Sequence, residues 1–190
     1  MQKQHRHIEK LFPRIKDIKD EALRRKVINV WLRAWEMSGF RSIEEFSAWP
    51  PEKEHLQLTN VEHTNQVAEC VIEVANVMNR VQKISINMDY LIGAVILHDV
   101  DKILLFEEDS GQLTTRGKFI AHISLSISLA LEQRIPIEII HAIATHSPNY
   151  SSISVKTPEA LILSHCDKMM MDNWMMSKKI DISFKLKDSN

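Results

Sequence analysis

The sequence predicts an all-α protein built as a bundle of helices. Only 4 of the 190 residues are glycine, which fits short helix connections and leaves no glycine-rich loop for binding a phosphate or a dinucleotide. Apolar residues recur every three or four positions through most of the chain, as they do on the buried face of a helix. At roughly 150 residues per domain, this length predicts one core domain with short extensions.

Residues 1–55 are expected to form a helical extension packed on the core. Residues 1–19 carry one apolar stripe and are predicted as a first helix, whose start or direction is altered by Pro13. Asp20 is the expected N-cap of a second helix, because its side chain can accept a hydrogen bond from the first helical amides. That helix should end before Gly39, a residue suited to a left-handed C-cap.

A short helix and a polar linker are predicted before the core domain. Ser42 and Glu45 have the spacing of a capping box, so we expect a helix over 43–48. Residues 50–59 are polar and start with two prolines, which indicates an extended linker or a lid. The core domain is assigned to residues 56–176.

The core domain contains five further stretches with helical periodicity. They cover residues 60–82, 88–99, 118–133, 136–146 and 158–176. A polar loop is predicted over 107–117, and Pro136 and Pro158 stand at first-turn positions, where proline is tolerated.

The tail, residues 177–190, has a different pattern. Apolar and polar residues alternate over 180–187, which predicts a short strand and not a helix. Trp31 and Trp35 lie one turn apart and are favoured as contacts between helices. The terminal strand and these two tryptophans are also candidate contacts of a homodimer.

Charge and cysteine content exclude several classes of protein. Lys plus Arg is 24 and Asp plus Glu is 25, so we expect neither a nucleic acid polymer nor an anionic membrane as a partner. The two cysteines, Cys70 and Cys166, cannot form a disulfide framework, and no CxxC zinc motif is present. The longest apolar stretch, at 91–97, is far shorter than the roughly 20 residues that span a bilayer. A reduced, cytoplasmic protein is predicted.

Six histidine and aspartate residues stand at core-facing positions or at helix ends in five of the predicted helices. This candidate ligand set consists of His63, His98, Asp99, His122, His146 and Asp167. A single buried histidine is usually a hydrogen-bonded structural residue, but six matched positions favour a common solution, because each buried polar group needs a partner. Imidazole and carboxylate ligands suit Fe, Mn, Zn, Co or Ni, and the lack of thiolate disfavours a structural zinc site. Six ligands are more than one open ion takes, whereas two ions sharing a carboxylate would use them all.

The order of the candidate ligand set is specific. It reads His, His-Asp, His, His, Asp, with 24 residues from the second histidine to the third and 24 from the third to the fourth. Lys102 follows the His-Asp pair closely. In these features the chain resembles the HD-domain superfamily of metal-dependent phosphohydrolases, over roughly residues 58–176.

The resemblance implies an all-α bundle around a binuclear metal centre. In the two-metal branch it implies a first ion held by His63, His98, Asp99 and Asp167. Asp99 would bridge to a second ion held by the two remaining histidines of the set. The implied cofactors are two divalent ions, Fe, Mn, Co or Zn, with Mg as a further option.

One position departs from the resemblance. The family commonly has glycine where this chain has Asp101, next to Lys102, the residue that resembles the family's anchor for the substrate anion. Asp101 could neutralise Lys102, donate a proton or face solvent. Arg116 and Lys118, from the neighbouring predicted loop, are further candidates for binding the substrate anion.

The function that follows is hydrolysis of a phosphoester in a nucleotide or a related small phosphorylated metabolite. A metal-activated bridging hydroxide would attack phosphorus, and Asp99 would orient it. Asp99 and Lys102 are therefore the candidate catalytic residues.

Two alternatives remain open at the level of sequence. A branch of the same superfamily, similar to inositol oxygenase, holds two irons with the same ligands and cleaves a C–C or C–P bond with O2. Iron content with substrate-dependent O2 uptake would identify it. The second alternative is a non-catalytic ligand-sensing HD module, which metal-free but normally folded protein would favour.

Overall fold

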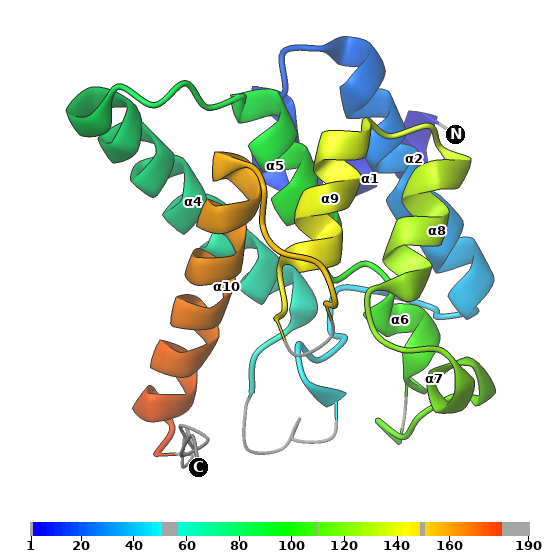
Figure 1. Ribbon diagram of the computed structural model, residues 1–190. Coiled ribbons are helices and arrows are strands. Elements are labelled where there is room, and N and C mark those ends of the chain that lie inside the picture. The colour runs from blue at the N-terminus through cyan, green and yellow to red at the C-terminus, as the bar shows by residue number, and fades with distance from the viewer. Residues whose placement is uncertain (1, 51–56, 109, 149–150, 180–190) are drawn as a thin grey trace.

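The computed structural model describes residues 2–50, 57–108, 110–148 and 151–179, which form a bundle of helices (Figure 1). Over these residues the only strand-like pairings are two isolated bridges, Ser47 with Thr59 and Phe106 with Leu113. The all-α prediction is confirmed. The strand predicted over 180–187 lies outside the described residues. None of the described helices is both long and apolar enough to pass through a bilayer.

The elements follow one another with short connections. In chain order they are α1 (Gln2–Leu11), the 3-10 helix η1 (Pro13–Asp17), α2 (Glu21–Ser38), α4 (Asn60–Gln82), α5 (Met88–Leu97), α6 (Lys102–Leu105), α7 (Thr115–Phe119), α8 (Ser124–Glu132), α9 (Ile137–Thr145) and α10 (Pro158–Ser177).

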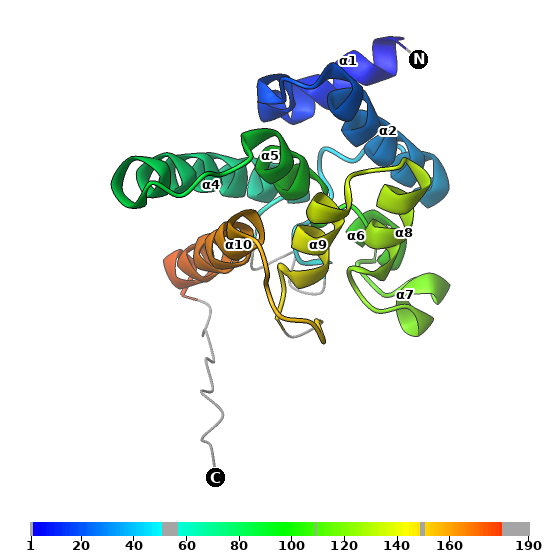
Figure 2. The same cartoon turned by 45° about the horizontal axis from the view of Figure 1, so that its top comes forward.

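Helix α5 is the centre of the bundle. All its residues from Leu91 to Leu97 are buried, because α2, α4, α9 and α10 pack around it. A helix that is apolar on every side is stable only when it is enclosed in this way. In Figure 2, α4 and α10 lie to one side of the molecule and α8 to the other, with α5 and α9 between them. The end of α5 is therefore surrounded by other helices.

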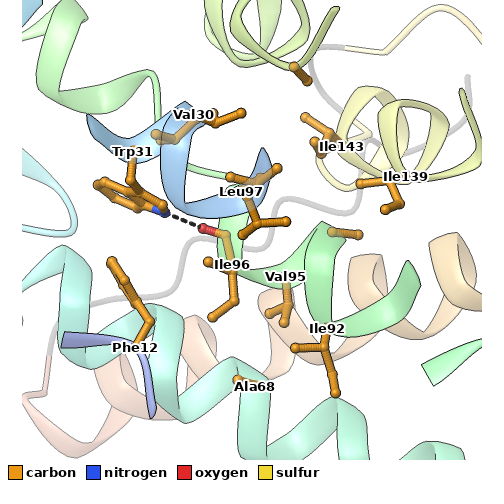
Figure 3. Packing of buried hydrophobic residues seen from close by; sticks show 14 of the residues in the cluster. Phe12, Val30, Trp31, Ala68, Ile92, Val95, Ile96, Leu97, Ile139 and Ile143 are labelled. Carbon is orange, nitrogen blue, oxygen red and sulfur yellow. Dashed lines mark hydrogen bonds between the residues drawn. The ribbon is translucent and has the colours of Figure 1, made fainter. Parts of the chain in front are cut away.

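The N-terminal helices belong to the same hydrophobic core as α5. Phe12 and Trp31 are buried, and their ring centroids lie 4.6 Å apart. The indole N–H of Trp31 donates a hydrogen bond of 2.8 Å to the carbonyl of Ile96, which Figure 3 shows as a dashed line. Trp31 is thus a contact between α2 and α5, buried inside the chain.

The first helix is shorter than predicted. Residues 1–19 do not form one helix, because Pro13 has no amide hydrogen to continue α1 and instead starts η1. The caps of α2 are confirmed. The Asp20 carboxylate accepts hydrogen bonds of 2.8 and 3.1 Å from the amides two and three residues ahead, and Gly39 adopts φ 74°.

The helix predicted over 43–48 is wrong. The Ser42 hydroxyl accepts a hydrogen bond of 3.2 Å from the amide of Glu44, and it does not form a capping box with Glu45. This local turn between Ser42 and Glu44 replaces the helix that the spacing of Ser42 and Glu45 predicted.

Residues 47 and 48 pair with residues 58 and 59, directly before α4. The amide of Ala48 donates to the carbonyl of Leu58 at 2.8 Å. Thr59 then caps α4 in a true capping box with Glu62, which the sequence reading missed. Of the linker predicted over 50–59, residues 51–56 lie outside the described residues.

The helix predicted over 118–133 is interrupted. It is divided into α7 and α8 by a turn at residues 120–123, where Ile123 has φ 82° and ψ −36°. The amide of Ile123 donates to a carboxylate oxygen of Asp101 at 2.6 Å and not to a carbonyl one turn back. The sequence reading also missed α6, a single turn of helix.

We expect Trp31→Phe to lower the free energy of unfolding by about 1–3 kcal/mol, because it leaves the buried carbonyl of Ile96 without a donor. Urea denaturation followed by circular dichroism would measure this. Trp35→Phe is the matched control, since its indole donates to the carbonyl of Phe40 in a hydrogen bond that is only partly buried. An equal loss in both variants would contradict the assignment.

Candidate metal centre

The six members of the candidate ligand set lie together where five parts of the bundle meet. His63 is on α4, His98 and Asp99 follow α5, His122 lies between α7 and α8, His146 follows α9, and Asp167 is on α10. Because α5 is enclosed by its neighbours, their side chains converge on its C-terminal end. The sequence prediction that these residues meet agrees with this arrangement.

One group of potential ligand atoms gathers between α4 and α5. His63, His98 and Asp99 each offer an atom within 4.8 Å of the others. A carboxylate oxygen of Asp167 lies 2.8 Å from Nε2 of His63 and 3.6 Å from Nε2 of His98. These four residues are the ones that the resemblance assigns to a first ion.

A second group shares one member with the first. Asp99, His122 and His146 also offer atoms within 4.8 Å of one another. Oδ1 of Asp99 lies 3.2 Å from Nε2 of His122 and 3.7 Å from Nε2 of His146, while its Oδ2 lies 3.3 Å from Nε2 of His98. The two oxygens of one carboxylate thus face two different groups, as a bridging ligand requires.

The four imidazole rings form a continuous row. The ring centroids of His63 and His98 are 5.6 Å apart, those of His98 and His146 are 5.1 Å apart, and those of His146 and His122 are 5.5 Å apart. Each pair is tilted edge to face, which lets neighbouring rings pack without stacking.

Two of these rings are oriented by the backbone of their own helix. Nδ1 of His98 lies 2.6 Å from the carbonyl of Val95, and Nδ1 of His146 lies 2.7 Å from the carbonyl of Ile143. A carbonyl can only accept, so Nδ1 is the donor in both cases. Each Nε2 therefore points into the site as a potential ligand.

His122 is oriented by a side chain instead. Its Nδ1 lies 3.0 Å from Oδ1 of Asp101, which is fully buried. The other oxygen of Asp101 accepts from the amide of Ile123. Of the three roles considered for Asp101, facing solvent is therefore wrong, and no ion pair joins its carboxylate to Lys102. Sequence reasoning missed the contact with His122 because it spans 21 residues.

Lys102 is buried beside the shared carboxylate. Its ammonium donates to Oδ2 of Asp99 at 2.6 Å and to the carbonyl of Ala48 at 2.8 Å. It also lies 5.9 Å from the ring centroid of Trp49. An ammonium group has three N–H donors, and these hydrogen bonds use two of them.

The pKa values of several charged groups of the site are shifted from their ordinary values. Burial disfavours the ionised forms, but nearby opposite charges outweigh it at most positions. The carboxylates of Asp99 and Asp167 raise the pKa of His98 to about 10, and the same kind of contact raises the pKa of His122 to about 9. Burial, with His98 nearby, lowers the pKa of His146 to about 4. The adjacent cationic groups keep the pKa of Asp99 and of Asp167 below the usual range.

These groups fit divalent metal ions. Nε2 of His98, which faces the carboxylates of Asp99 and Asp167, is buried and makes no hydrogen bond in the described part of the chain. The carboxylates that favour protonated imidazoles favour any other cation in the same place, so an ion would displace protons from the rings. Burial raises the pKa of Cys166 to about 12, so this thiol stays protonated and is a poor ligand.

The two predicted anion-binding residues on α7 lie apart from the ligand set. Arg116 is exposed and donates to the carbonyl of Met37, at the end of α2, at 3.1 Å. Lys118 is exposed on the same helix. The hydrogen bond of Arg116 thus joins it to α2, outside the candidate ligand set.

The comparisons with known proteins agree with the geometry. The chain is 27% identical over 169 residues to a dihydroneopterin 2',3'-cyclic phosphate phosphodiesterase of Methanocaldococcus jannaschii, a match that covers 85% of this chain and 68% of that protein. No solved structure matches the chain significantly. The family model described as "HD domain" matches residues 60–172, which include all six candidate ligands. This match covers more than half of the sequence, and the chain belongs to the HD domain family.

Proposed function

We propose that this chain is a metal-dependent phosphohydrolase that opens a small cyclic phosphodiester. One observation carries the proposal: the buried carboxylate of Asp99 is shared by two groups of ligand atoms, so that two ions would lie on either side of it. Such paired ions are typical of enzymes that transfer a phosphoryl group to water. The similarity to a phosphodiesterase favours hydrolysis over the oxygenase alternative.

The candidate ligands divide between the two proposed ion sites. His63, His98 and Asp167 would complete the first, and His122 and His146 the second, with Asp99 common to both. Two divalent ions supply, when bound, positive charge for the phosphoryl group and a lowered pKa for water. Fe, Mn, Co and Zn suit this mixture of imidazole and carboxylate.

The chain's own residues would bind and orient the substrate. Among the six candidate ligands, only Asp167 and His122 have side chains that are more than slightly exposed, at 18% and 14%. The substrate would therefore approach from their side. Lys102 has one N–H group beyond its two hydrogen bonds, and this group would donate to a phosphoryl oxygen.

The first substrates to test are cyclic phosphates. The relative in M. jannaschii is named for dihydroneopterin 2',3'-cyclic phosphate, so this compound and nucleoside 2',3'-cyclic phosphates form the panel. We expect release of a phosphomonoester in the presence of Mn2+, Fe2+, Co2+ or Zn2+. Protein that binds ions but hydrolyses no phosphoester with any of them would contradict the proposed function.

Replacing the shared carboxylate should remove both activity and metal. We expect Asp99→Asn to lower kcat/KM by more than about 100-fold, since losing even an indirect partner of a metal ligand costs about 10–100-fold. Elemental mass spectrometry should show less bound metal. His165→Ala is the control, because this exposed residue lies on α10 two positions before Asp167 and belongs to neither ligand group. Full metal content with full activity in Asp99→Asn would exclude the assignment.

Replacing the buried lysine should separate substrate binding from metal binding. We expect Lys102→Met to lower kcat/KM by about 10–100-fold, because the loss of a charged hydrogen-bond donor costs about 1.5–3 kcal/mol. The metal content should stay at the wild-type level. Lys118→Met, an exposed lysine on α7, is the matched control. A parallel loss of metal would show instead that Lys102 acts by holding Asp99.

Removing metal should destabilise the fold. A ligand present at 100 times its Kd stabilises the native state by about 2.7 kcal/mol. For a chain of this size that corresponds to an increase in Tm of about 5–10 °C over chelator-treated protein. Differential scanning calorimetry with and without Mn2+ would measure the shift. Asp99→Asn serves as the control. If Mn2+ leaves the Tm unchanged in both proteins, the result would argue against a metal site.

A further inference from the structure

Asp101 is a buried carboxylate to which neither the resemblance nor the ligand geometry assigns a role. It is fully buried, yet it is not close enough to the other members of either group to belong to them. Its two oxygens have separate partners: Nδ1 of His122 at 3.0 Å and the amide of Ile123 at 2.6 Å. One side chain therefore holds both the ring of a candidate ligand and the backbone that follows it.

The contact with the ring decides which nitrogen of His122 can bind a metal. A carboxylate only accepts, so Nδ1 carries the proton that faces Asp101. Nε2, which lies 3.2 Å from Oδ1 of Asp99, is then the nitrogen that faces the second ligand group. A cation at this group would take the place of the Nε2 proton, and Asp101 would keep the other proton in place.

The contact with the backbone holds a turn that the local sequence does not favour. Ile123 has φ 82°, a conformation that is rare for a β-branched residue. Its amide would donate within the helix if α7 and α8 were continuous, but Asp101 accepts that hydrogen bond instead. The amide of Asp101 in turn donates to the hydroxyl of Ser126, on the first turn of α8, at 3.2 Å. The turn that carries His122 into the site is therefore tied to the segment after Asp99.

Two of the other three rings of the row, His98 and His146, do not need such a side chain. His98 and His146 each donate to a carbonyl three residues earlier in their own chain segment. His122 lies in a turn between helices, and its Nδ1 faces the carboxylate of Asp101. The ring orientation in the second ligand group thus depends on a side chain, Asp101, that belongs to neither group.

We propose that Asp101 is the positioning residue of the second ion site and that it determines whether the chain holds two ions or one. The inference rests on the proposed function, which assigns two ions to the two ligand groups. The first site, at His63 and His98, does not need Asp101, whereas the second site does.

Asp101→Asn is the sharpest test because it keeps the size of the side chain. Its single carbonyl oxygen can accept from only one of the two donors. If it accepts from Ile123, its amide NH2 faces the ring and forces Nδ1 to accept, which places the ring proton on Nε2 and blocks ligation. We expect the second ion to bind about 10–100-fold more weakly and the first to bind with unchanged affinity.

Mn2+ titration followed by electron paramagnetic resonance measures this directly. Wild-type protein should show the signal of two coupled ions, and Asp101→Asn should show that of one isolated ion at the same Mn2+ concentration. His122→Ala marks the spectrum of a lost second site. Ser124→Ala is the matched control, because this exposed residue on the first turn of α8 belongs to neither ligand group, and it should keep both ions.

A double variant covers the case in which Asp101→Asn does not fold. Ile123→Gly removes the side chain that makes the positive φ unfavourable, so the turn needs less support. We expect Ile123→Gly alone to bind two Mn2+ ions and Asp101→Asn with Ile123→Gly to bind one. Circular dichroism checks the helix content of each protein.

The outcomes separate this inference from the proposed function. Wild-type protein that never binds a second ion would overturn the two-ion proposal, and this inference with it. Two ions of unchanged affinity in Asp101→Asn, or in the double variant, would overturn this inference alone. Loss of both ions in a folded Asp101→Asn protein would also overturn it, because the first site would then depend on Asp101.

Discussion

A negative charge buried at the end of an apolar helix sets the conditions for the rest of this structure. Asp99 follows α5, which is enclosed on all sides, and its carboxylate is nearly inaccessible to water. A buried carboxylate without partners is too costly for a folded protein, so compensating groups must surround it. Lys102 supplies one, and imidazoles from neighbouring helices supply the others. The enclosure of α5 and the assembly of the site are therefore two results of the same packing.

The three imidazoles nearest to Asp99 differ chemically although they lie in one row. His98 and His122 face carboxylates, which raise their pKa. His146 is fully buried next to His98, and burial lowers its pKa. The raised pKa values of His98 and His122 favour protons on these two rings, which together with Lys102 offset the negative charge of the buried carboxylates. Divalent ions in place of those protons would add positive charge that can act on a phosphoryl group, which agrees with membership of the HD domain family.

The parts of the fold that were predictable from sequence are those that local signals specify. The helical period of buried residues marks α4 and α10, and Asp20 and Gly39 mark the ends of α2, because caps involve only near neighbours. The candidate ligands were recognisable because polar residues interrupt apolar stripes. The break before α8 was not predictable, because Ile123 donates to Asp101, which is 22 residues away in sequence. The helix expected over 43–48 failed for a related reason, since Ser47 bridges to Thr59 across the linker.

The hydrogen bonds that orient the histidines differ in whether a substitution at the acceptor residue can remove them. The carbonyls of Val95 and Ile143 belong to the backbone, so every residue type at those two positions supplies the same acceptor. Alanine scanning would therefore find no sign of these contacts, and neither would a comparison of residue types among relatives. The support of His122 is instead encoded in a single side chain, at Asp101. During evolution, the ring orientations of His98 and His146 can therefore persist whatever residue replaces Val95 or Ile143. The orientation of His122 can instead be lost or gained through a single substitution at position 101.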